Sequence, residues 1–137
     1  MPVGYTIELT ETARRVYERI LRQARACADA GDLVSSKVTE FKMVEEVLDR
    51  IIPHDPFAPQ RALAGPLSGI FRIKQGRMRI CYAGSSKQRK IVVLYISDTL
   101  RKEGDVRDPY SVLTRLVLSG EFNGVLDSLG LRRPRHR

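Results

Sequence analysis

Apolar and polar side chains alternate on both sides of a glycine-containing turn in residues 69–82. Such alternation predicts two strands, each buried on one face and joined as a hairpin. If the apolar side chains of both strands share the core side, as hairpin register requires, four cations gather on the opposite face: Arg72, Lys74, Arg77 and Arg79. Like charges placed together cost stability. This face is therefore either a solvated sheet surface or a surface that binds an anion.

A strand and two helices are predicted before the hairpin. Residues 5–9 alternate, and Thr10 is suited to cap a helix, because its hydroxyl accepts from a free backbone N–H of the first turn. Apolar positions then recur at helical spacing until Gly31 ends the helix. Ser35 or Ser36 is placed to cap a second helix, and the short connection predicts a helical hairpin laid on a sheet.

Pro53 is expected to stop the second helix, because proline lacks the amide hydrogen and clashes with the preceding turn. The Pro-rich loop after it holds His54 beside Asp55, which form either an acid–base pair or a solvated loop pair. Residues 91–96 are apolar at every position, which predicts a central strand covered on both faces. A short helix is predicted at residues 111–118.

The chain of 137 residues suits one compact domain, and its 42% of hydrophobic residues suffices for a core. We assign residues 1–130 to this domain and residues 131–137 to a basic, disordered tail. The chain lacks a membrane-span pattern and a secretory signal pattern, so we expect a cytoplasmic protein without a membrane partner. Cys27 and Cys81 have no partners at metal-ligand spacing, so no metal site is expected.

The net charge of +8 and pI of about 9.9 favour a polyanionic partner, which is nucleic acid, an acidic protein or an anionic membrane surface. The segment 101–110 is strongly charged and follows the most apolar strand. Loops held by a rigid strand are common positions for functional residues. This segment and the basic face of the hairpin are therefore the two candidate parts of a site.

The order of these elements and several local motifs resemble the RelE/ParE family of bacterial toxins from type II toxin–antitoxin systems. The resemblance is carried by residues 5–10 with Ala13, 63–73, 77–82, 91–96 and 101–102, and spans about Tyr5 to Tyr110. It implies an α+β, RelE-like fold, in which a small, twisted, mostly antiparallel sheet of four strands carries two N-terminal helices on one face. A short C-terminal helix follows, and the other face of the sheet is expected to be a concave basic groove.

The resemblance also implies an activity. Members similar to RelE cut mRNA in the ribosomal A site without a metal, and members similar to ParE inhibit DNA gyrase. Both are neutralised by a small antitoxin that wraps the toxin. We therefore expect a toxin that is a metal-free, ribosome-dependent mRNA endoribonuclease, with a cognate antitoxin, mRNA and the ribosome as partners and no cofactor. Two alternatives remain, a gyrase-inhibiting toxin without nuclease activity and a non-toxic basic nucleic-acid-binding protein.

By their position in the family pattern, four residues match catalytic ones. Arg101 would stabilise charge on the phosphate with Arg79 as helper or structural neighbour, since arginine offers paired donors to phosphate oxygens. Lys74 would position the substrate or transfer a proton, and Tyr110 would stack on a base or act in acid–base catalysis. Asp108 is either an acid–base group or the cap of the last helix. Residues expected to bind RNA are Arg72, Arg77 and Lys102.

Overall fold

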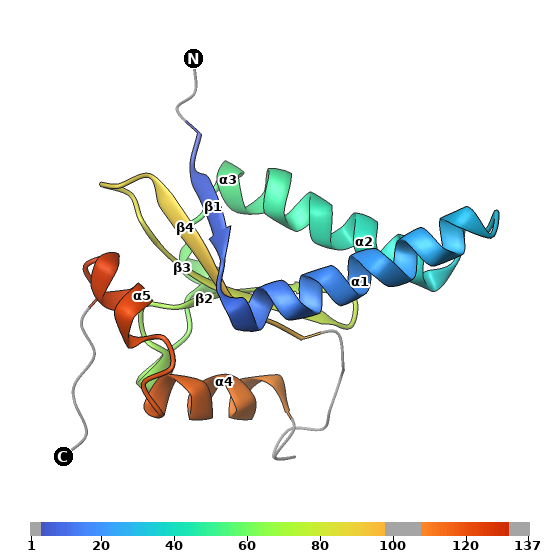
Figure 1. Ribbon diagram of the computed structural model, residues 1–137. Helices are drawn as coiled ribbons and strands as arrows, with labels where there is room; N and C mark the ends of the chain where they lie inside the picture. The colour runs from blue at the N-terminus through green and yellow to red at the C-terminus, as the bar shows by residue number, and fades with distance from the viewer. Residues whose placement is uncertain (1–3, 98–107, 132–137) are drawn as a thin grey trace.

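A mixed sheet of four strands forms the middle layer of the protein, with two long helices on one face and two shorter helices on the other (Figure 1). The computed structural model describes residues 4–97 and 108–131. The strands, in the spatial order β1-β4-β3-β2, are β1 (Thr6–Leu9), β2 (Phe71–Gln75), β3 (Met78–Ser85) and β4 (Lys90–Ser97). The helices are α1 (Glu11–Asp29), α2 (Ser36–Glu46), α3 (Ile52–His54), α4 (Pro109–Leu118) and α5 (Asn123–Ser128). Only β1 and β4 pair in parallel, which confirms the expected α+β fold with a mostly antiparallel sheet.

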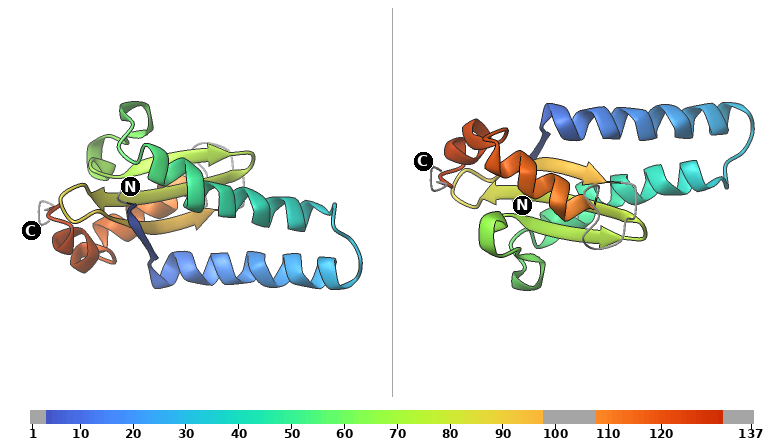
Figure 2. Two further views of the ribbon diagram at one scale, coloured as in Figure 1. Left: turned by 90° about the horizontal axis from the view of Figure 1, so that it is seen from above. Right: turned by 90° about the horizontal axis from the view of Figure 1, so that it is seen from below.

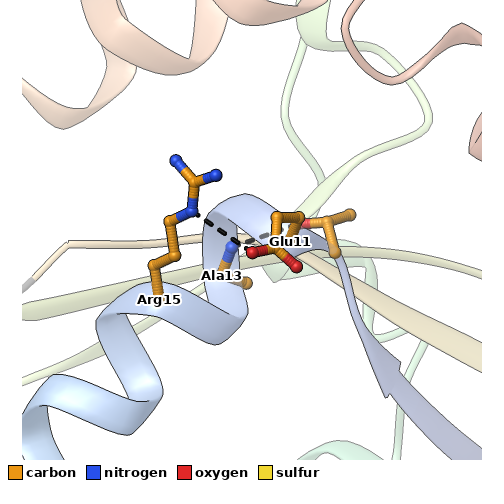
Figure 3. Close-up of polar contacts among 4 residues, drawn as sticks. Glu11, Ala13 and Arg15 are labelled. Carbon is orange, nitrogen blue, oxygen red and sulfur yellow. Dashed lines mark hydrogen bonds and ion pairs between the residues drawn. The ribbon is translucent and has the colours of Figure 1, made fainter.

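The first helix begins where its sequence predicts. The Thr10 hydroxyl accepts the N–H of Ala13 at 3.1 Å and donates to the Leu94 carbonyl at 2.7 Å, so one side chain caps α1 and ties it to the central strand. Glu11 pairs with Arg15 at 3.3 Å one turn on (Figure 3). This exposed pair adds only a few tenths of a kcal/mol, about what i,i+4 pairs contribute.

The second helix also has its predicted cap, because the Ser35 side chain accepts the N–H of Val38 at 3.2 Å. The tip of the α1–α2 hairpin extends past the sheet in both views of Figure 2. Leu33 and Val34, in the connection between the two helices, are exposed. The main apolar core is formed between the base of this hairpin and the sheet, where Ile20, Val44 and other helix residues meet β3 and β4.

The helix predicted to stop at Pro53 ends one residue later, at His54. α2 continues through a π-helical segment, Val47–Ile51, directly into α3. The N–H of Ile52 donates to the carbonyl of Val47, five residues back rather than four. Proline disrupts a helix because it has no N–H for the carbonyl four residues before it and its ring presses on that carbonyl. The wider π spacing relieves this conflict, so the helical path runs on to His54.

The second face of the sheet is covered by α4 and α5 rather than open. Leu113 and Val117 of α4 and Leu126 of α5 are buried against the sheet, in a cluster that includes Val92 and Leu94 of β4. Ile91, Val93 and Ile96 of β4 belong to the core under α1 and α2. The prediction of a central strand covered on both faces is thus confirmed, but the expected concave basic groove on this face needs correction, because α4 and α5 pack there. Apolar side chains on both faces of β4 require a second covering layer.

The chain beyond α5 still packs on this layer. The N–H of Leu131 donates to the Leu126 carbonyl at 2.8 Å, and the Leu131 side chain contacts the cluster under α4 and α5. Residues 132–137 of the predicted tail lie outside the described residues. None of the helices in the described part of the chain is long and apolar enough to cross a membrane.

Candidate functional site

The hairpin of β2 and β3 places its cations on the face where α4 packs. In the register of the two strands, Lys74 lies directly opposite Arg79, and Arg72 lies opposite Cys81. Cys81 belongs to the apolar cluster under α4, whereas Ile73 and Ile80 belong to the core under α1 and α2. The alternation therefore predicted correctly that Arg72, Lys74 and Arg79 share one face, opposite the apolar side chains.

Arg77, the fourth predicted cation of this face, lies elsewhere. Gln75 and Met78 are the last pair of the ladder, so Gly76 and Arg77 form a two-residue turn. Gly76 has a φ of 59°, which is the conformation that glycine supplies at the first position of a tight hairpin turn. Arg77 is consequently exposed at the tip of the hairpin and not aligned with Arg79 on the strand. The reading of Arg77 as a strand residue was wrong because alternation alone does not locate the turn.

Arg79 is held by the turn. Its Nη1 donates to the carbonyls of Gly76 at 3.0 Å and Met78 at 2.9 Å. Directly opposed like charges destabilise a sheet, and these carbonyl dipoles offset part of the repulsion between Arg79 and Lys74. Arg79 is half-buried, whereas Lys74 is exposed. Arg79 therefore has bonds that stabilise the turn, and Lys74 is the more exposed cation of the pair.

Tyr110 comes to this face from the first turn of α4. Arg72 Nη1 donates to the Tyr110 hydroxyl at 3.0 Å, and the guanidinium carbon lies 5.6 Å from the centre of the tyrosine ring. Both residues are candidate site residues by their positions in the sequence, but the sequence does not indicate that they meet. The contact joins β2 to a helix whose first turn is 38 positions further along the chain. It brings a phenol and a cation together at Arg72, two residues before Lys74 on the same face of β2.

Asp108 caps α4, which decides between its two predicted roles. Its carboxylate accepts the N–H of Ser111 at 3.1 Å and the Ser111 hydroxyl at 3.4 Å, and only 8% of Asp108 is exposed. A carboxylate at this position also interacts favourably with the helix dipole. Arg101 and Lys102, the remaining predicted site residues, lie outside the described residues.

Cys81 lies under the cations but is not available as a nucleophile. Burial raises the pKa of its thiol to about 12, although Arg72 and Arg79 pull that pKa down in part. The thiolate is the reactive form of cysteine, so the Cys81 thiol remains protonated and inert at neutral pH. Among residues 4–97 and 108–131, no group of three or more His, Cys, Asp or Glu side chains is placed to hold a metal ion.

A cavity beside the hairpin was not predicted from the sequence. A cavity of about 290 Å³ follows the outer edge of β2 and is lined by Ile51, Gln60, Arg61, Arg72, Ile73, Lys74 and Gln75. Gln60 and Arg61 come from the loop between α3 and β2, where no periodic pattern marked them. The one feature of the sequence that could have indicated them is the basic character of Arg61 shortly before the hairpin. His54, by contrast, is exposed at the end of α3.

A family model described as a toxin with endonuclease activity, of a toxin–antitoxin system, matches residues 7–132. A search of curated protein sequences gave no match. Among solved structures, the RelBE2 toxin–antitoxin complex of Mycobacterium tuberculosis aligns with a TM-score of 0.51 and 21% identity, over 71% of this chain and 93% of that one. The isolated RelE toxin of E. coli aligns with a TM-score of 0.52 and 16% identity, over 82% and 98%. The YoeB/ParE toxin of Agrobacterium tumefaciens gives 0.50 and 16%, over 66% and 94%.

These structural similarities establish the fold, and the expected resemblance to RelE is confirmed. The family model covers nearly the whole sequence and both layers of helices. The chain therefore belongs to the YhaV family of toxins with endonuclease activity, from toxin–antitoxin systems.

Proposed function

We propose that this toxin is an mRNA endoribonuclease that acts on the ribosome without a metal, and that it cuts RNA through the RNA's own 2′-hydroxyl. The observation that carries the proposal is the contact between Arg72 and Tyr110, which places a cation and a phenol side by side, with Lys74 two residues further along the same face of β2. The family description supplies the class of activity, an endonuclease.

In the proposed reaction the 2′-oxygen of one nucleotide bonds to the adjacent phosphorus, and the bond from phosphorus to the 5′-oxygen of the next nucleotide breaks. The 2′-hydroxyl releases its proton to water, the leaving 5′-oxygen gains a proton, and the products are a 2′,3′-cyclic phosphate and a free 5′-hydroxyl. Negative charge increases on the phosphate oxygens in the transition state. Arg72 offers planar paired donors to these oxygens, and Lys74 adds a point charge beside them. Fixed donors of this kind act on the transition state more than on the bound substrate.

Tyr110 is suited to protonate the leaving 5′-oxygen. Its oxygen already accepts a hydrogen bond from Arg72, so its own proton is directed away from the guanidinium. A phenol held in this way donates to an oxygen bound next to Arg72. General acid catalysis of this kind contributes about 10²–10⁴-fold to a rate.

In our proposal the reaction depends on the ribosome because Asp108 caps α4 and does not serve as a general base. The carboxylate nearest to Tyr110 in sequence is occupied by the cap of α4 and is not free to take the proton of the 2′-hydroxyl. We assign the alignment of that hydroxyl to the ribosome, which presents mRNA in a fixed conformation. The net charge of +8 favours association with such an RNA-rich particle.

A cognate antitoxin is the second partner in the proposal. The RelBE2 structure contains an antitoxin bound to a toxin of the same fold. The exposed cations of the hairpin, Lys74 and Arg77, suit contact with an acidic segment of such a protein. Arg101 and Lys102 keep their sequence-based roles here, in phosphate stabilisation and substrate positioning.

The proposal is tested with purified toxin, mRNA and ribosomes stalled on that mRNA. We expect new mRNA 5′ ends within the ribosomal A site, a free 5′-hydroxyl on each, and about 100-fold slower cutting by Tyr110→Phe. Arg50→Ala, which removes an exposed arginine that pairs with Glu46 in the helical layer, is the matched control and should cut normally. Intact mRNA together with inhibition of DNA gyrase would replace the nuclease by the ParE-like alternative. Cutting of naked RNA at the same rate would remove the ribosome from the proposal.

A further inference from the structure

The cavity along β2 has a wall that is rigidly built. Tyr82 donates its hydroxyl proton to the Pro56 carbonyl at 2.7 Å, and the ring of Phe57 packs against the ring of Phe71 at 5.7 Å. Arg61 Nη1 donates to the Asp55 carbonyl at 3.0 Å, which closes the loop on itself. The loop that carries Gln60 and Arg61 is thus fixed to the sheet beside the start of β2, which is visible in Figure 2. A preformed wall lowers the entropic cost of binding a ligand there.

The floor of the cavity offers an unpaired strand edge. β2 is the last strand of the sheet, and the preceding loop covers only its beginning, where Leu63 N–H donates to the Ile70 carbonyl at 2.9 Å. Backbone groups alternate in direction along a strand, so those of Lys74 point to the same side as the Ile70 carbonyl. No described segment pairs with them there. Lys74 therefore presents one backbone donor and one backbone acceptor to the cavity.

The remaining lining combines apolar, amide and cationic groups. Ile51 and Ile73 supply apolar surface, Gln60 supplies an amide with donors and an acceptor, and the guanidinium of Arg61 supplies a flat cation. Single-stranded RNA is recognised by such sets, because bases stack on flat or apolar groups and are read through hydrogen bonds on their edges. The cavity of about 290 Å³ is large enough for one base.

We infer that this cavity holds an unpaired base of the RNA, next to the phosphate bound by Arg72, and that Gln60 reads the edge of that base. The inference rests on the proposed function, since it deepens the substrate preference of the same site. Arg72 lines the cavity and also contacts Tyr110, so it connects the base to the reacting phosphate. Lys74 and Arg61 face the flanking backbone. The toxin would then cut preferentially beside one kind of base.

The test is a binding measurement that needs no cutting. Short single-stranded RNAs with 2′-O-methyl groups, which cannot be cut by 2′-hydroxyl attack, carry each of the four bases at each position in turn. We expect the wild type to distinguish the four bases at one position by about fivefold or more in affinity, as paired amide contacts to bases do. Gln60→Ala should reduce this difference to about twofold or less while keeping the melting temperature, because Gln60 is exposed and no other described group depends on it.

Gln88→Ala is the matched control. Gln88 lies in the connection between β3 and β4, and its amide donates to the Ser128 carbonyl at 2.8 Å, so this variant loses a glutamine with no relation to the cavity. It should keep the wild-type base pattern. Gln60→Glu, which replaces the amide donors with acceptors, should change which base is preferred.

Three outcomes overturn the inference. In the first, the wild type binds all four bases equally at every position. In the second, Gln60→Ala keeps the full difference in affinity among the four bases. In the third, Gln60→Ala leaves RNA binding intact and instead weakens binding of the antitoxin. The last outcome would make the strand edge a protein-docking surface. Failure of the proposed function is a separate result, in which unmodified mRNA stays intact on ribosomes. If the base pattern still depends on Gln60 in that case, the cavity is an RNA-binding site of a toxin that does not cut.

Discussion

Arg72 and Tyr110 join the basic hairpin to α4, with the guanidinium of Arg72 donating to the tyrosine hydroxyl at 3.0 Å and lying 5.6 Å from its ring centre. The pair combines a charged hydrogen bond with a cation–π contact. Both need the arginine, but only the first needs the phenol oxygen. Replacing the oxygen therefore separates the chemical role of Tyr110 from its role in packing.

Tyr110→Phe should reduce mRNA cutting by about 100-fold and change the free energy of unfolding by only about 1–2 kcal/mol. The loss of rate is that of a general acid, and the loss of stability is that of one hydrogen bond to a charged group, partly exposed. Single-turnover cutting on ribosomes and urea denaturation measure the two quantities. If Tyr110→Phe were strongly destabilised, and if its cutting rate fell only as much as its folded fraction, Tyr110 would be a packing residue and not a general acid.

Lys74→Gln should weaken RNA binding without weakening the fold. It removes the charge that stands opposite Arg79 in the register, so the free energy of unfolding should stay the same or rise by a few tenths of a kcal/mol. The slope of log affinity against log salt should fall by about 0.7, which corresponds to one phosphate contact on single-stranded RNA. Lys42→Gln, which removes an exposed lysine from α2, should leave the slope unchanged. Equal slopes for the two variants would place Lys74 outside the RNA-binding surface.

Local chemistry in the sequence was enough to predict the elements. The caps at Thr10 and Ser35 follow from hydroxyl groups placed before helical patterns, and both hydrogen bonds are present. Alternation correctly assigned Arg72, Lys74 and Arg79 to one face, since a strand exposes every second side chain to the same side. These features depend on neighbours within a few positions, which a sequence shows directly.

Features that depend on distant segments were not predictable in this way. The 38 positions between Arg72 and Tyr110 mean that only the packing of α4 decides their contact. The covering of the second sheet face by α4 and α5 likewise depends on tertiary packing, and it corrects the expected open groove. The π-helical segment before Pro53 shows the same limit at short range, because the sequence indicated a helix end near Pro53 but not this change in helix type.

Gly84→Ala should destabilise the protein by about 1–3 kcal/mol, as overpacking of a core does. A methyl group at Gly84 would lie 2.5 Å from Ile91 Cδ1, 3.0 Å from the Lys90 carbonyl and 3.2 Å from Phe57 Cε1. Gly124→Ala is the control, because a methyl group there meets nothing within 4 Å. Gly124 lies in α5, so alanine should stabilise that helix by up to about 1 kcal/mol. Thermal and urea unfolding measure both variants. If Gly84→Ala were as stable as the wild type, β3 and β4 would have to shift apart at this point at little cost in free energy.

The stability of the helical hairpin should depend on pH in the alkaline range through Tyr17. Burial, the hydrogen bond to Glu45 and the charge of that carboxylate together raise the pKa of Tyr17 from 10.0 to about 12. The folded protein therefore holds this proton between pH 10 and 12, where an unfolded chain releases it. Stability from this group is fully present below pH 10 and is lost as the pH rises towards 12.

Tyr17→Phe removes the titrating group and keeps the ring, which packs near Phe41. Urea unfolding at pH 9, 10 and 11 should show a wild-type free energy of unfolding that falls more steeply with pH than that of the variant. Tyr82, whose pKa burial also raises, is present in both proteins, so the difference between the two curves isolates Tyr17. Parallel curves would show that Tyr17 loses its proton as readily in the folded protein as in the unfolded chain, because its hydrogen bond to Glu45 does not persist in solution.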